Sequence, residues 1–216
     1  PETFEMVHVK AVSPNREQPV LPSACDLWDI ANFYEREVYD FYGVIFVNHP
    51  DLRRIFLRED WVGFPFRKDD KPEEKNEEIA VGDEPISDLA PCYTLNADGS
   101  LHCEKTPIFG EDDYVINLGP QHPSTHGVLH FRTRIDGEII TKIDPHLGYI
   151  HRAIEKISES LTYPQTLALT DRMDYLGAMQ NRHALCACIE QAMGVEVSDR
   201  VQVIRTIMDE LQRIDS

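Results

Sequence analysis

Residues 69–88 read DDKPEEKNEEIAVGDEPISD, a stretch that is rich in acidic residues, poor in aromatic residues and interrupted by proline and glycine. A segment of this composition buries too little apolar surface to offset the conformational entropy lost on folding. The stretch therefore divides the chain. We predict an acidic linker over residues 69–112, with one patterned region on each side of it, residues 1–68 and residues 113–216.

The overall composition excludes several classes of protein. The chain has 216 residues, an apolar content of 42% and a formal net charge of −17. The apolar content suits a globular core, and the negative charge argues against a nucleic-acid partner, whose phosphates it would repel. No apolar run reaches the ~18 residues of a membrane-spanning helix. The start, PETFEMVHVK, lacks the basic and apolar segments of a signal peptide. It also lacks an initiator methionine, and the end stops inside a helical pattern, so we interpret the chain as a fragment of a longer polypeptide.

The first region contains the pattern of one amphipathic helix. Pro22, Ser23 and Asp26 resemble a helix start with a capping box, and Gly43 supplies a natural end. A short apolar run, VIFV, follows, and residues 48–68 are punctuated by proline and glycine, which predicts irregular structure. The apolar residues that recur at helical spacing are Leu27, Ile30, Ala31, Tyr34, Val38 and Phe41.

The same helix also carries a crowd of charges in the segment EREVYD. The pattern favours a solvated charged face with aromatic residues packed beneath it. The alternative is a docking helix whose charges pair with a partner subunit. The charged residues are Glu35, Arg36, Glu37 and Asp40.

The third region begins with strand patterns and continues with helical ones. YVINL and VLHFRTRI predict two strands, and Asp136-Gly137 predicts a hairpin to a third strand. Helical spacing follows over residues 150–161, over residues 173–193, and in a last helix that Ser198 can cap. The second of these helices is apolar on more than one face, which predicts burial. We therefore expect a small antiparallel sheet that leads into a helical bundle.

The five cysteines form no CxxC pair, and their odd number fits a reducing compartment better than a disulfide scaffold. Cys92, His102 and Cys103 fall in one segment and could be considered for zinc. That segment offers no recognisable fourth ligand, which weakens the zinc interpretation.

The sequence NLGPQHPSTHG, residues 117–127, places His122 and His126 beside turn-forming prolines and a glycine. Three interpretations stay open from these residues alone. The polar side chains can satisfy backbone groups of a turn, the histidines can bind a metal with His130 or His146, or one histidine can handle a proton.

Two sets of motifs resemble known proteins. YEREVYDFYGVIF, HPDLRRIF and DWVGFPFRKD, within residues 20–70, resemble the signature region of the 30 kDa-type (C) subunit of proton-pumping NADH–quinone oxidoreductase, respiratory complex I. NLGPQHPSTHGVLHF, DPHLGYIHRAIEKISE, DRMDYLGAM and RVQVIRTIMDELQRI, within residues 114–216, resemble its 49 kDa-type (D) subunit. Together they resemble the fused C/D form found in some bacteria.

The resemblance implies a fold. The class is α+β: residues 1–68 would be the C-terminal part of a small α/β C-subunit-like domain, residues 69–112 the linker, and residues 113–216 the N-terminal part of a D-subunit-like domain. In that last part the helical bundle would be related to the nickel–iron hydrogenase large subunit.

The resemblance also implies the loss of a metal site. Related membrane-bound hydrogenases carry a CxxC pair one residue after an Asp-Arg dipeptide. This chain has DRMDYLG there, with Asp174 and Gly177 at the two cysteine positions. Neither supplies a thiolate, so this pair cannot build a nickel–iron centre. The corresponding cavity in complex I is the quinone headgroup pocket.

Two residues match the family's quinone ligands. His126 matches the histidine that hydrogen-bonds the headgroup, and Tyr175 matches the tyrosine on its other side. A histidine with an ordinary pKa of about 6.5 donates a proton near neutral pH, and a tyrosine with a pKa of about 10 is a good hydrogen-bond donor. Together they can stabilise the charge that develops on a quinone during reduction. The family's acidic partner of the histidine would lie beyond Ser216.

Two arginines match residues near the terminal iron–sulfur cluster, which cysteines of a different subunit hold. These are Arg152 and Arg172. A guanidinium near such a cluster favours its reduced form and raises its potential. The alternatives are a surface ion pair of Arg152 with Glu155 and pairing of Arg172 with Asp171.

The resemblance as a whole implies a peripheral-arm subunit that helps transfer electrons from NADH to quinone. Quinone would be the substrate, and the 4Fe–4S cluster would belong to a neighbouring subunit. The partners would be the terminal-cluster subunit, the ferredoxin-like subunit, the large iron–sulfur subunit and the membrane arm. The place would be the cytoplasmic side of the bacterial inner membrane. NADH itself would bind elsewhere, since no GxGxxG occurs. The alternative functions are a membrane-bound hydrogenase subunit and a non-catalytic docking scaffold.

Overall fold

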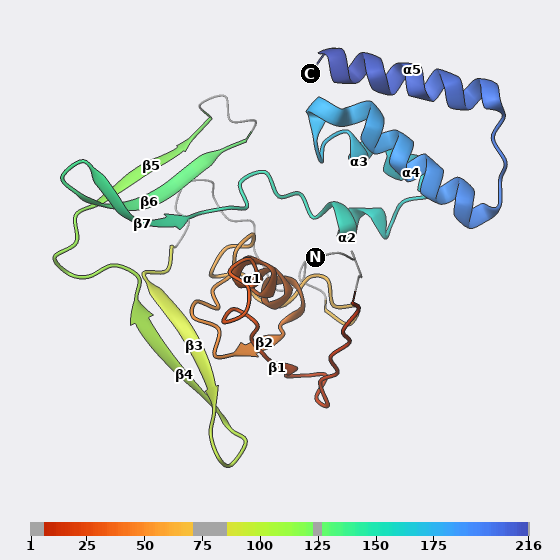
Figure 1. Cartoon of the computed structure of the whole chain (residues 1–216). Helices are drawn as coiled ribbons and strands as arrows, with labels where there is room; N and C mark the ends of the chain where they lie inside the picture. The colour runs from red at the N-terminus through yellow and green to blue at the C-terminus, as the bar shows by residue number, and fades with distance from the viewer. Residues whose placement is uncertain (1–6, 71–85, 123–126, 216) are drawn as a thin grey trace. The chain divides into compact units, whose positions relative to one another are not determined.

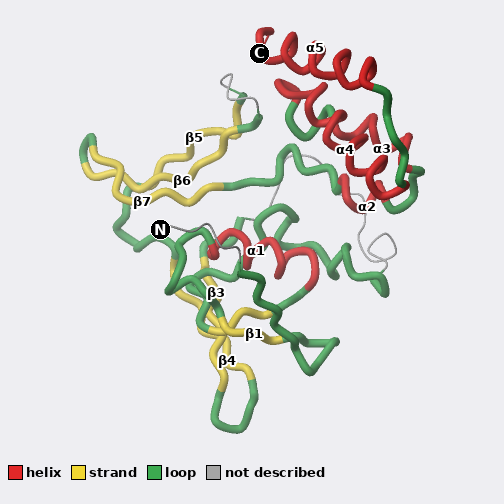
Figure 2. The backbone as a smooth tube through the Cα atoms, turned by 45° about the vertical axis from the view of Figure 1, so that its right-hand side comes forward, coloured by secondary structure: helices red, strands yellow, loops and turns green. Residues whose placement is uncertain are grey.

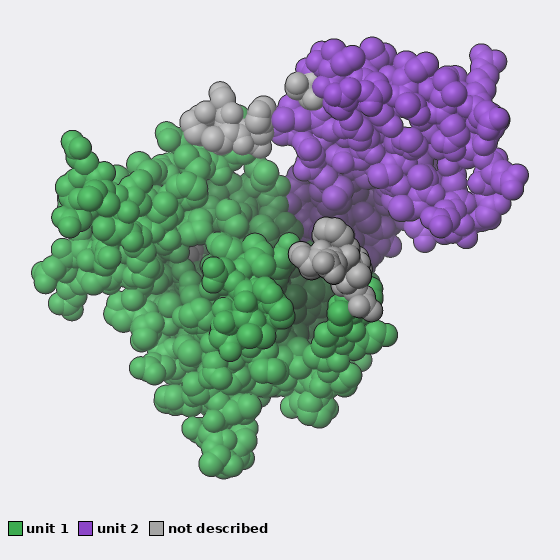
Figure 3. All heavy atoms as spheres, in the orientation of Figure 1, with its two compact units in different colours: residues 1–151 green, residues 152–216 purple. Residues whose placement is uncertain are grey.

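The structure is a computed structural model that describes residues 7–70, 86–122 and 127–215. It divides into two compact units, Pro1–His151 and Arg152–Ser216, which Figure 3 colours separately. Each unit is described by itself. The mixture of small sheets and helices confirms a chain with both α and β structure, and a relation to the hydrogenase large subunit stays a prediction.

The first unit is built on a four-stranded sheet in the order β1-β2-β3-β4 (Figure 1). The strands β1, β2 and β3 are parallel to one another, and β4 is antiparallel to β3. The single helix of this unit among the described residues, α1, packs near β2, and Ile45, Phe46 and Leu52 form a buried core cluster there. The bounds are β1 Val20–Pro22, α1 Ala31–Tyr42, β2 Ile45–Val47, β3 Leu89–Leu95 and β4 Leu101–Pro107.

The β3–β4 hairpin corrects the prediction of a linker for residues 89–107. In Figures 1 and 2 this hairpin extends away from β1 and β2. Its turn is local, since Gly99 has φ +82° and donates its N–H to the Asn96 carbonyl at 3.0 Å. Its attachment is not local, because Tyr93 pairs with Val47 of β2. Composition cannot reveal such a distant pairing. The assignment of residues 1–68, 69–112 and 113–216 to subunit-like parts stays a prediction.

Helix α1 ends as predicted but starts later. Gly43 ends it with φ +76°, in the left-handed region that glycine adopts freely. The predicted capping box at Ser23 is not a helix start. Instead, the Ser23 hydroxyl and the Ala24 N–H each donate to the Glu35 carboxylate at 2.7 Å. Glu35 thus holds the preceding loop against the side of the helix.

Three of the four charged residues of α1 are buried, so the prediction of a solvated face is wrong. Glu35, Arg36 and Asp40 are 7%, 5% and 0% exposed. Each is satisfied by groups distant in sequence, as buried charges require. Arg36, for example, donates to the carbonyls of Arg53 and Arg54 at 3.1 and 3.0 Å. The charged motif of the first region therefore organises the irregular residues that follow it.

The first unit also contains a three-stranded antiparallel sheet in the order β5-β6-β7, as predicted. The hairpin at Asp136-Gly137 is confirmed, with Asp136 opposite Ile139 and Gly137 at φ +61°. One face of this sheet carries Arg132 and Asp144, which are 8% and 4% exposed. The bounds are β5 Val115–Gln121, β6 Leu129–Asp136 and β7 Ile139–Pro145.

The second unit is helical. The helix predicted over residues 150–161 is only the short α2, and α3 is an unpredicted helix although Thr162 and Gln165 form a capping box at its start. No helix of the described residues is both long and apolar enough to cross a membrane. The elements are α2 Ile154–Ser158, α3 Tyr163–Thr170, the 3-10 helix η2 Tyr175–Gly177, α4 Ala178–Met193 and α5 Asp199–Asp215.

The helices α4 and α5 lie side by side and meet through polar side chains (Figures 1 and 2). Arg205 donates to Glu190 at 2.8 and 2.5 Å, and His183 Nδ1 lies 2.6 Å from Asp209 Oδ2. The predicted burial of the helix over residues 173–193 is wrong for this chain alone, because no residue of α4 is buried. The apolar residues of α5 are likewise exposed: Val201, Val203, Ile204, Ile207, Met208, Leu211 and Ile214.

Candidate functional site

The two predicted quinone ligands fall in different parts of the chain. His126 lies outside the described residues. Tyr175 is the first residue of η2 in the second unit, and its side chain is 49% exposed. His122, whose role the sequence leaves open, is exposed after the end of β5.

The segment around Tyr175 has the local geometry of a helix start. Asp174 precedes η2 in an extended conformation, and its Oδ1 accepts the N–H of Leu176 at 3.1 Å. A Cβ added at Gly177 would lie 3.5 Å from Asp174 Oδ2, so the side chains of these two positions face the same space. This is the proximity that a chelating CxxC pair needs. With an aspartate that caps and a glycine that has no side chain, the two positions hold no thiol.

The chain before Tyr175 is held by α4. Asn181 Nδ2 donates to the carbonyls of Asp174 and Thr170 at 3.0 and 3.4 Å, and Arg182 pairs with Asp171. Sequence reasoning misses Asn181 and Arg182. These two residues lie across the turn between α3 and α4 from the segment they hold, so no local sequence pattern predicts the contact.

The two arginines predicted to face the cluster form no ion pair with the carboxylates considered for them. Arg152 and Arg172 are exposed, and neither pairs with Glu155 or Asp171 among the residues that the structure describes. Most other arginines in the described part of the chain have a carboxylate partner, as Arg182 and Arg205 do. The role of Arg152 and Arg172 beside the cluster stays a prediction.

One group of side chains in the described residues has metal-like spacing, Cys25, Glu35 and His49, whose ligand atoms lie within 4.8 Å of one another. Hydrogen bonds already occupy it. His49 Nδ1 accepts the Asp51 N–H at 3.0 Å, and His49 Nε2 lies 3.1 Å from the Asn32 carbonyl. Burial lowers the pKa of His49 and raises the pKa of Cys25, which keeps both groups neutral.

That cluster therefore has a structural role. The zinc interpretation of Cys92, His102 and Cys103 gains nothing from the structure, because these residues lie along β3 and β4 and no metal-like group of the described residues includes them.

A buried ionic network joins the second sheet to the residues after β2. The Asp144 carboxylate accepts Arg53 Nη2 and Arg132 Nη2, each at 2.7 Å, and His146 Nε2 lies 3.1 Å from its Oδ2. Burial raises the pKa of Asp144, but hydrogen bonds from His146, Arg53 and Arg132 outweigh that effect and hold the pKa well below the usual aspartate value. Asp144 therefore stays ionised. Arg53 also binds both carboxylate oxygens of Asp51 at 2.7 Å.

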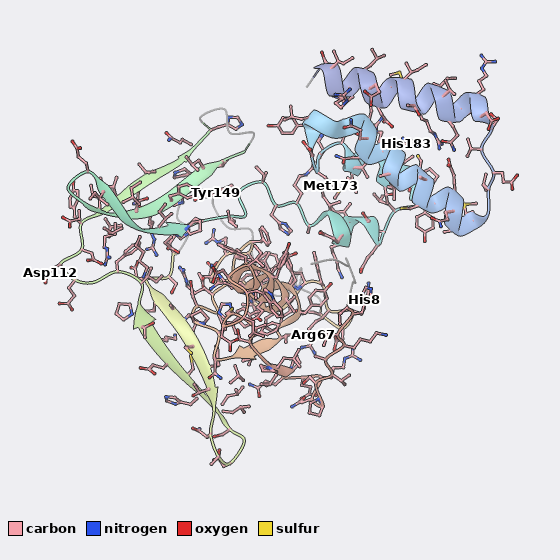
Figure 4. The ribbon with its side chains drawn as sticks, viewed as in Figure 1. His8, Arg67, Asp112, Tyr149, Met173 and His183 are labelled. Carbon is pink, nitrogen blue, oxygen red and sulfur yellow. The ribbon has the colours of Figure 1, made fainter. Side chains whose placement is uncertain are left out.

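Close to Asp144 lies a pair of histidines. The rings of His130 and His146 are 4.8 Å apart, and the His146 backbone N–H donates to the His130 carbonyl at 2.9 Å. His130 Nδ1 is 2.7 Å from the hydroxyl of Tyr149, which Figure 4 labels on the chain after β7. The metal interpretation of these histidines is not supported in the described residues, since no metal-like group contains them.

The sequence matches known proteins along its whole length. Residues 2–76 match the family described as respiratory-chain NADH dehydrogenase, 30 Kd subunit. The chain is 61% identical over 214 residues to the C/D subunit of NADH-quinone oxidoreductase from Bacteroides thetaiotaomicron, covering 99% of this chain and 40% of that protein. For the protein of the same name from Phocaeicola vulgatus, the identity is 63% over 214 residues, covering 99% of this chain and 41% of the relative.

A more distant relative also matches. The C/D 2 subunit of NADH-quinone oxidoreductase from Aquifex aeolicus is 37% identical over 227 residues, covering 100% of this chain and 38% of that protein. The chain thus spans about 40% of the length of the curated relatives it matches.

Proposed function

We propose that this chain forms one side of the quinone headgroup pocket in the peripheral arm of respiratory complex I. The proposal starts from the family to which the chain belongs, the fused C/D subunits of NADH–quinone oxidoreductase. The observation that carries the proposal is the segment Asp174–Gly177. It brings together Asp174 and Gly177, the two positions that the resemblance matches to the metal-binding cysteines of hydrogenases, and it offers no thiol there. It also begins η2 with the half-exposed Tyr175.

The chemistry follows from the residue types. Reduction of a quinone places negative charge on both carbonyl oxygens. Tyr175 donates a hydrogen bond to one of them and His126 to the other. The two side chains then deliver the two protons that, with two electrons from the cluster, complete the quinol. The assignment of His126 rests on the motif HPSTHG, since the residue lies outside the described part of the structure.

Arg152 and Arg172 face the electron donor in this proposal. The chain's own cysteines do not fit a four-iron cluster, because the five are spread over β3, β4, α4 and the loop before α1. In this proposal a neighbouring subunit holds the terminal 4Fe–4S cluster. The two exposed guanidinium groups, which have no partner among the described side chains, stabilise its reduced form by their charge.

The proposal includes a place in the cell and a set of neighbours. The chain lies at the cytoplasmic side of the bacterial inner membrane, attached to the membrane arm and to the terminal-cluster, ferredoxin-like and large iron–sulfur subunits. NADH binds to another subunit, and electrons reach this chain's pocket through the clusters.

The test is made in the intact enzyme with His126→Ala and Tyr175→Phe. Quinone reduction should fall by on the order of a hundredfold for His126→Ala, the size of a lost general acid. NADH oxidation by an artificial electron acceptor should survive in both variants. Tyr163→Phe, an exposed tyrosine in the same unit, is the matched control and should keep both activities. If both activities also persist in His126→Ala and Tyr175→Phe, the pocket is wrongly assigned and the docking-scaffold function stands instead.

A further inference from the structure

Residues 144–151, which we call the strap, comprise the last two residues of β7 and the chain from there to the boundary of the first unit. They belong to the motif DPHLGYIHR, and nothing in the proposed function explains them. The residue that follows the strap is Arg152, which the proposal places near the terminal cluster. The contacts that hold the strap therefore restrict the backbone immediately before Arg152.

The first attachment of the strap is ionic. Asp144 forms an ion pair with Arg53, and each of these side chains is only 5% exposed. Arg53 comes from the motif HPDLRRIF of the first region, far from Asp144 in sequence. Because both charges are buried, loss of either partner removes a charge-assisted hydrogen bond that the remaining partners, Arg132 for Asp144 and Asp51 for Arg53, replace only in part.

The second attachment is a close backbone contact. Gly148 has φ +99°, and a Cβ added there would collide with the carbonyl oxygen of Phe56. Only glycine allows the strap to lie this close to the backbone of residues 55–57.

The third attachment is aromatic. The His151 ring packs against Phe41 with centroids 5.0 Å apart and against Phe56 with centroids 5.2 Å apart, at interplanar angles of 28° and 25°. Phe66 extends the cluster, 4.3 Å from Phe41. His151 Nε2 is buried and has no hydrogen-bond partner among the described residues. The imidazole therefore contributes here through the stacking of its flat ring on Phe41 and Phe56.

We propose that the first region of the chain positions Arg152 through the strap, and that His151 is a positioning residue that acts by aromatic packing and not by proton transfer or metal binding. The inference rests on the proposed role of Arg152 for its functional part. Its structural part, that the strap anchors the chain before α2, is tested independently.

The structural test is hydrogen–deuterium exchange in the intact complex, read on the peptide covering residues 152–158. Its reporter is the Ile157 N–H, which donates to the Ala153 carbonyl at 3.0 Å. His151→Ala should speed exchange by on the order of tenfold, because two stacked ring contacts are lost. His151→Phe should restore slow exchange, since it keeps the ring and removes an unsatisfied nitrogen.

A second pair of variants avoids changing the ring. Gly148→Ala meets the Phe56 backbone, whereas Gly137→Ala, at another glycine of positive φ, has nothing within 4 Å of the added Cβ. Both variants carry the same kind of backbone strain. Faster exchange in Gly148→Ala than in Gly137→Ala supports the anchor. Equal exchange in the two variants and in His151→Ala overturns it.

The functional test is the midpoint potential of the terminal cluster. Arg152→Ala should lower it, and His151→Ala should lower it in the same direction while His151→Phe leaves it unchanged. A drop with Arg152→Ala alone would reject the positioning role and keep the proposed function. No drop with Arg152→Ala would reject the role of that arginine, with the exchange result still deciding on the strap. Equal damage from His151→Phe and His151→Ala would show that the nitrogen atoms matter, and would overturn the aromatic role.

Discussion

Arg53 Nη2 lies 2.7 Å from Asp144 Oδ1, and this buried ion pair joins two regions that the sequence places on opposite sides of an acidic stretch. Arg132 completes the pair from the neighbouring strand, also at 2.7 Å. Asp144 therefore attaches the second sheet to the first region by charge.

We predict that Asp144→Asn destabilises the first unit by about 1.5–3 kcal/mol, because two buried arginines lose the carboxylate they share and keep only Asp51 and the exposed Asp88 as partners. The measurement is the temperature of thermal inactivation of the intact enzyme. Asp113→Asn is the control. Its partner Arg134 is 38% exposed and solvent screens the pair, so this change should cost much less than Asp144→Asn. Similar losses in the two variants would contradict the central role of Asp144.

The pH dependence of this joint follows from the lowered pKa of Asp144. A carboxylate whose pKa is lower in the folded state stabilises the fold above its unfolded pKa of about 3.9, and loses that contribution as pH falls toward the folded pKa. Inactivation of the wild type should therefore steepen below about pH 4. Asp144→Asn should be less stable at neutral pH and show a shallower acid limb. An unchanged acid limb would assign the acid sensitivity to other carboxylates.

A further prediction concerns the buried carboxylate of Asp40. Its Oδ2 accepts the N–H groups of Ile55, Phe56 and Leu57 at 3.1, 2.8 and 2.9 Å, and its Oδ1 accepts Arg54 at 2.9 Å. Asp40→Asn should cost about 3 kcal/mol or more, because a fully buried carboxylate with four donors loses its charge.

The readout for Asp40→Asn is again the inactivation temperature. Glu37→Gln, on the same helix, removes a charge that makes no hydrogen bond or ion pair within the described residues, so it should change the stability by less than about 0.5 kcal/mol. If Glu37→Gln destabilises as strongly as Asp40→Asn, the charge of the helix as a whole matters, and not this contact.

Arg172→Gln tests the electrostatic role of the DRMDY motif. In the proposed role Arg172 is a cation near the terminal cluster, so its removal should lower the midpoint potential of that cluster. The potential is measured by redox titration followed by electron paramagnetic resonance. Arg200→Gln, an exposed arginine of α5 without a carboxylate partner in the described part of the chain, is the control for general charge effects. Equal shifts in both variants would mean that net charge, and not position, sets the potential.

Metal analysis separates the proposed function from that of a hydrogenase subunit. Asp174 and Gly177 supply no thiolate, so the intact complex should contain iron and no stoichiometric nickel. Elemental analysis of the purified complex provides the measurement. One nickel per complex would contradict the quinone pocket.

Local signals predict part of the fold. Gly43 and Asp136-Gly137 act within a few residues of themselves, and both end their elements as expected. The β3–β4 hairpin escapes prediction because Tyr93 gains its place from Val47, a pairing without local trace. The predicted start of α1 is wrong because Ser23 does not cap a helix. Its hydroxyl instead donates to the carboxylate of Glu35, which lies within α1.

The candidate site shows the same division. His126, Tyr175, Arg152 and Arg172 come from resemblance to a family, and no periodicity or spacing would have selected them. The contacts that hold the surrounding chain, such as Asn181 to Asp174, connect residues across a turn and can be found only in three dimensions.

The polar contact between α4 and α5 has a consequence for how this pair responds to salt. Its ion pair, Arg205 with Glu190, is about a fifth exposed on each side, and at 1 M salt the Debye length shrinks to about 3 Å. The apolar residues on the rest of α5 respond in the opposite sense, since salts such as sulfate strengthen their exclusion from water. Raising the concentration of such a salt therefore loosens α5 from α4 while it favours burial of the outer side of α5. The concentration of such a salt thus shifts the balance between the contact of α5 with α4 and the burial of the apolar residues of α5.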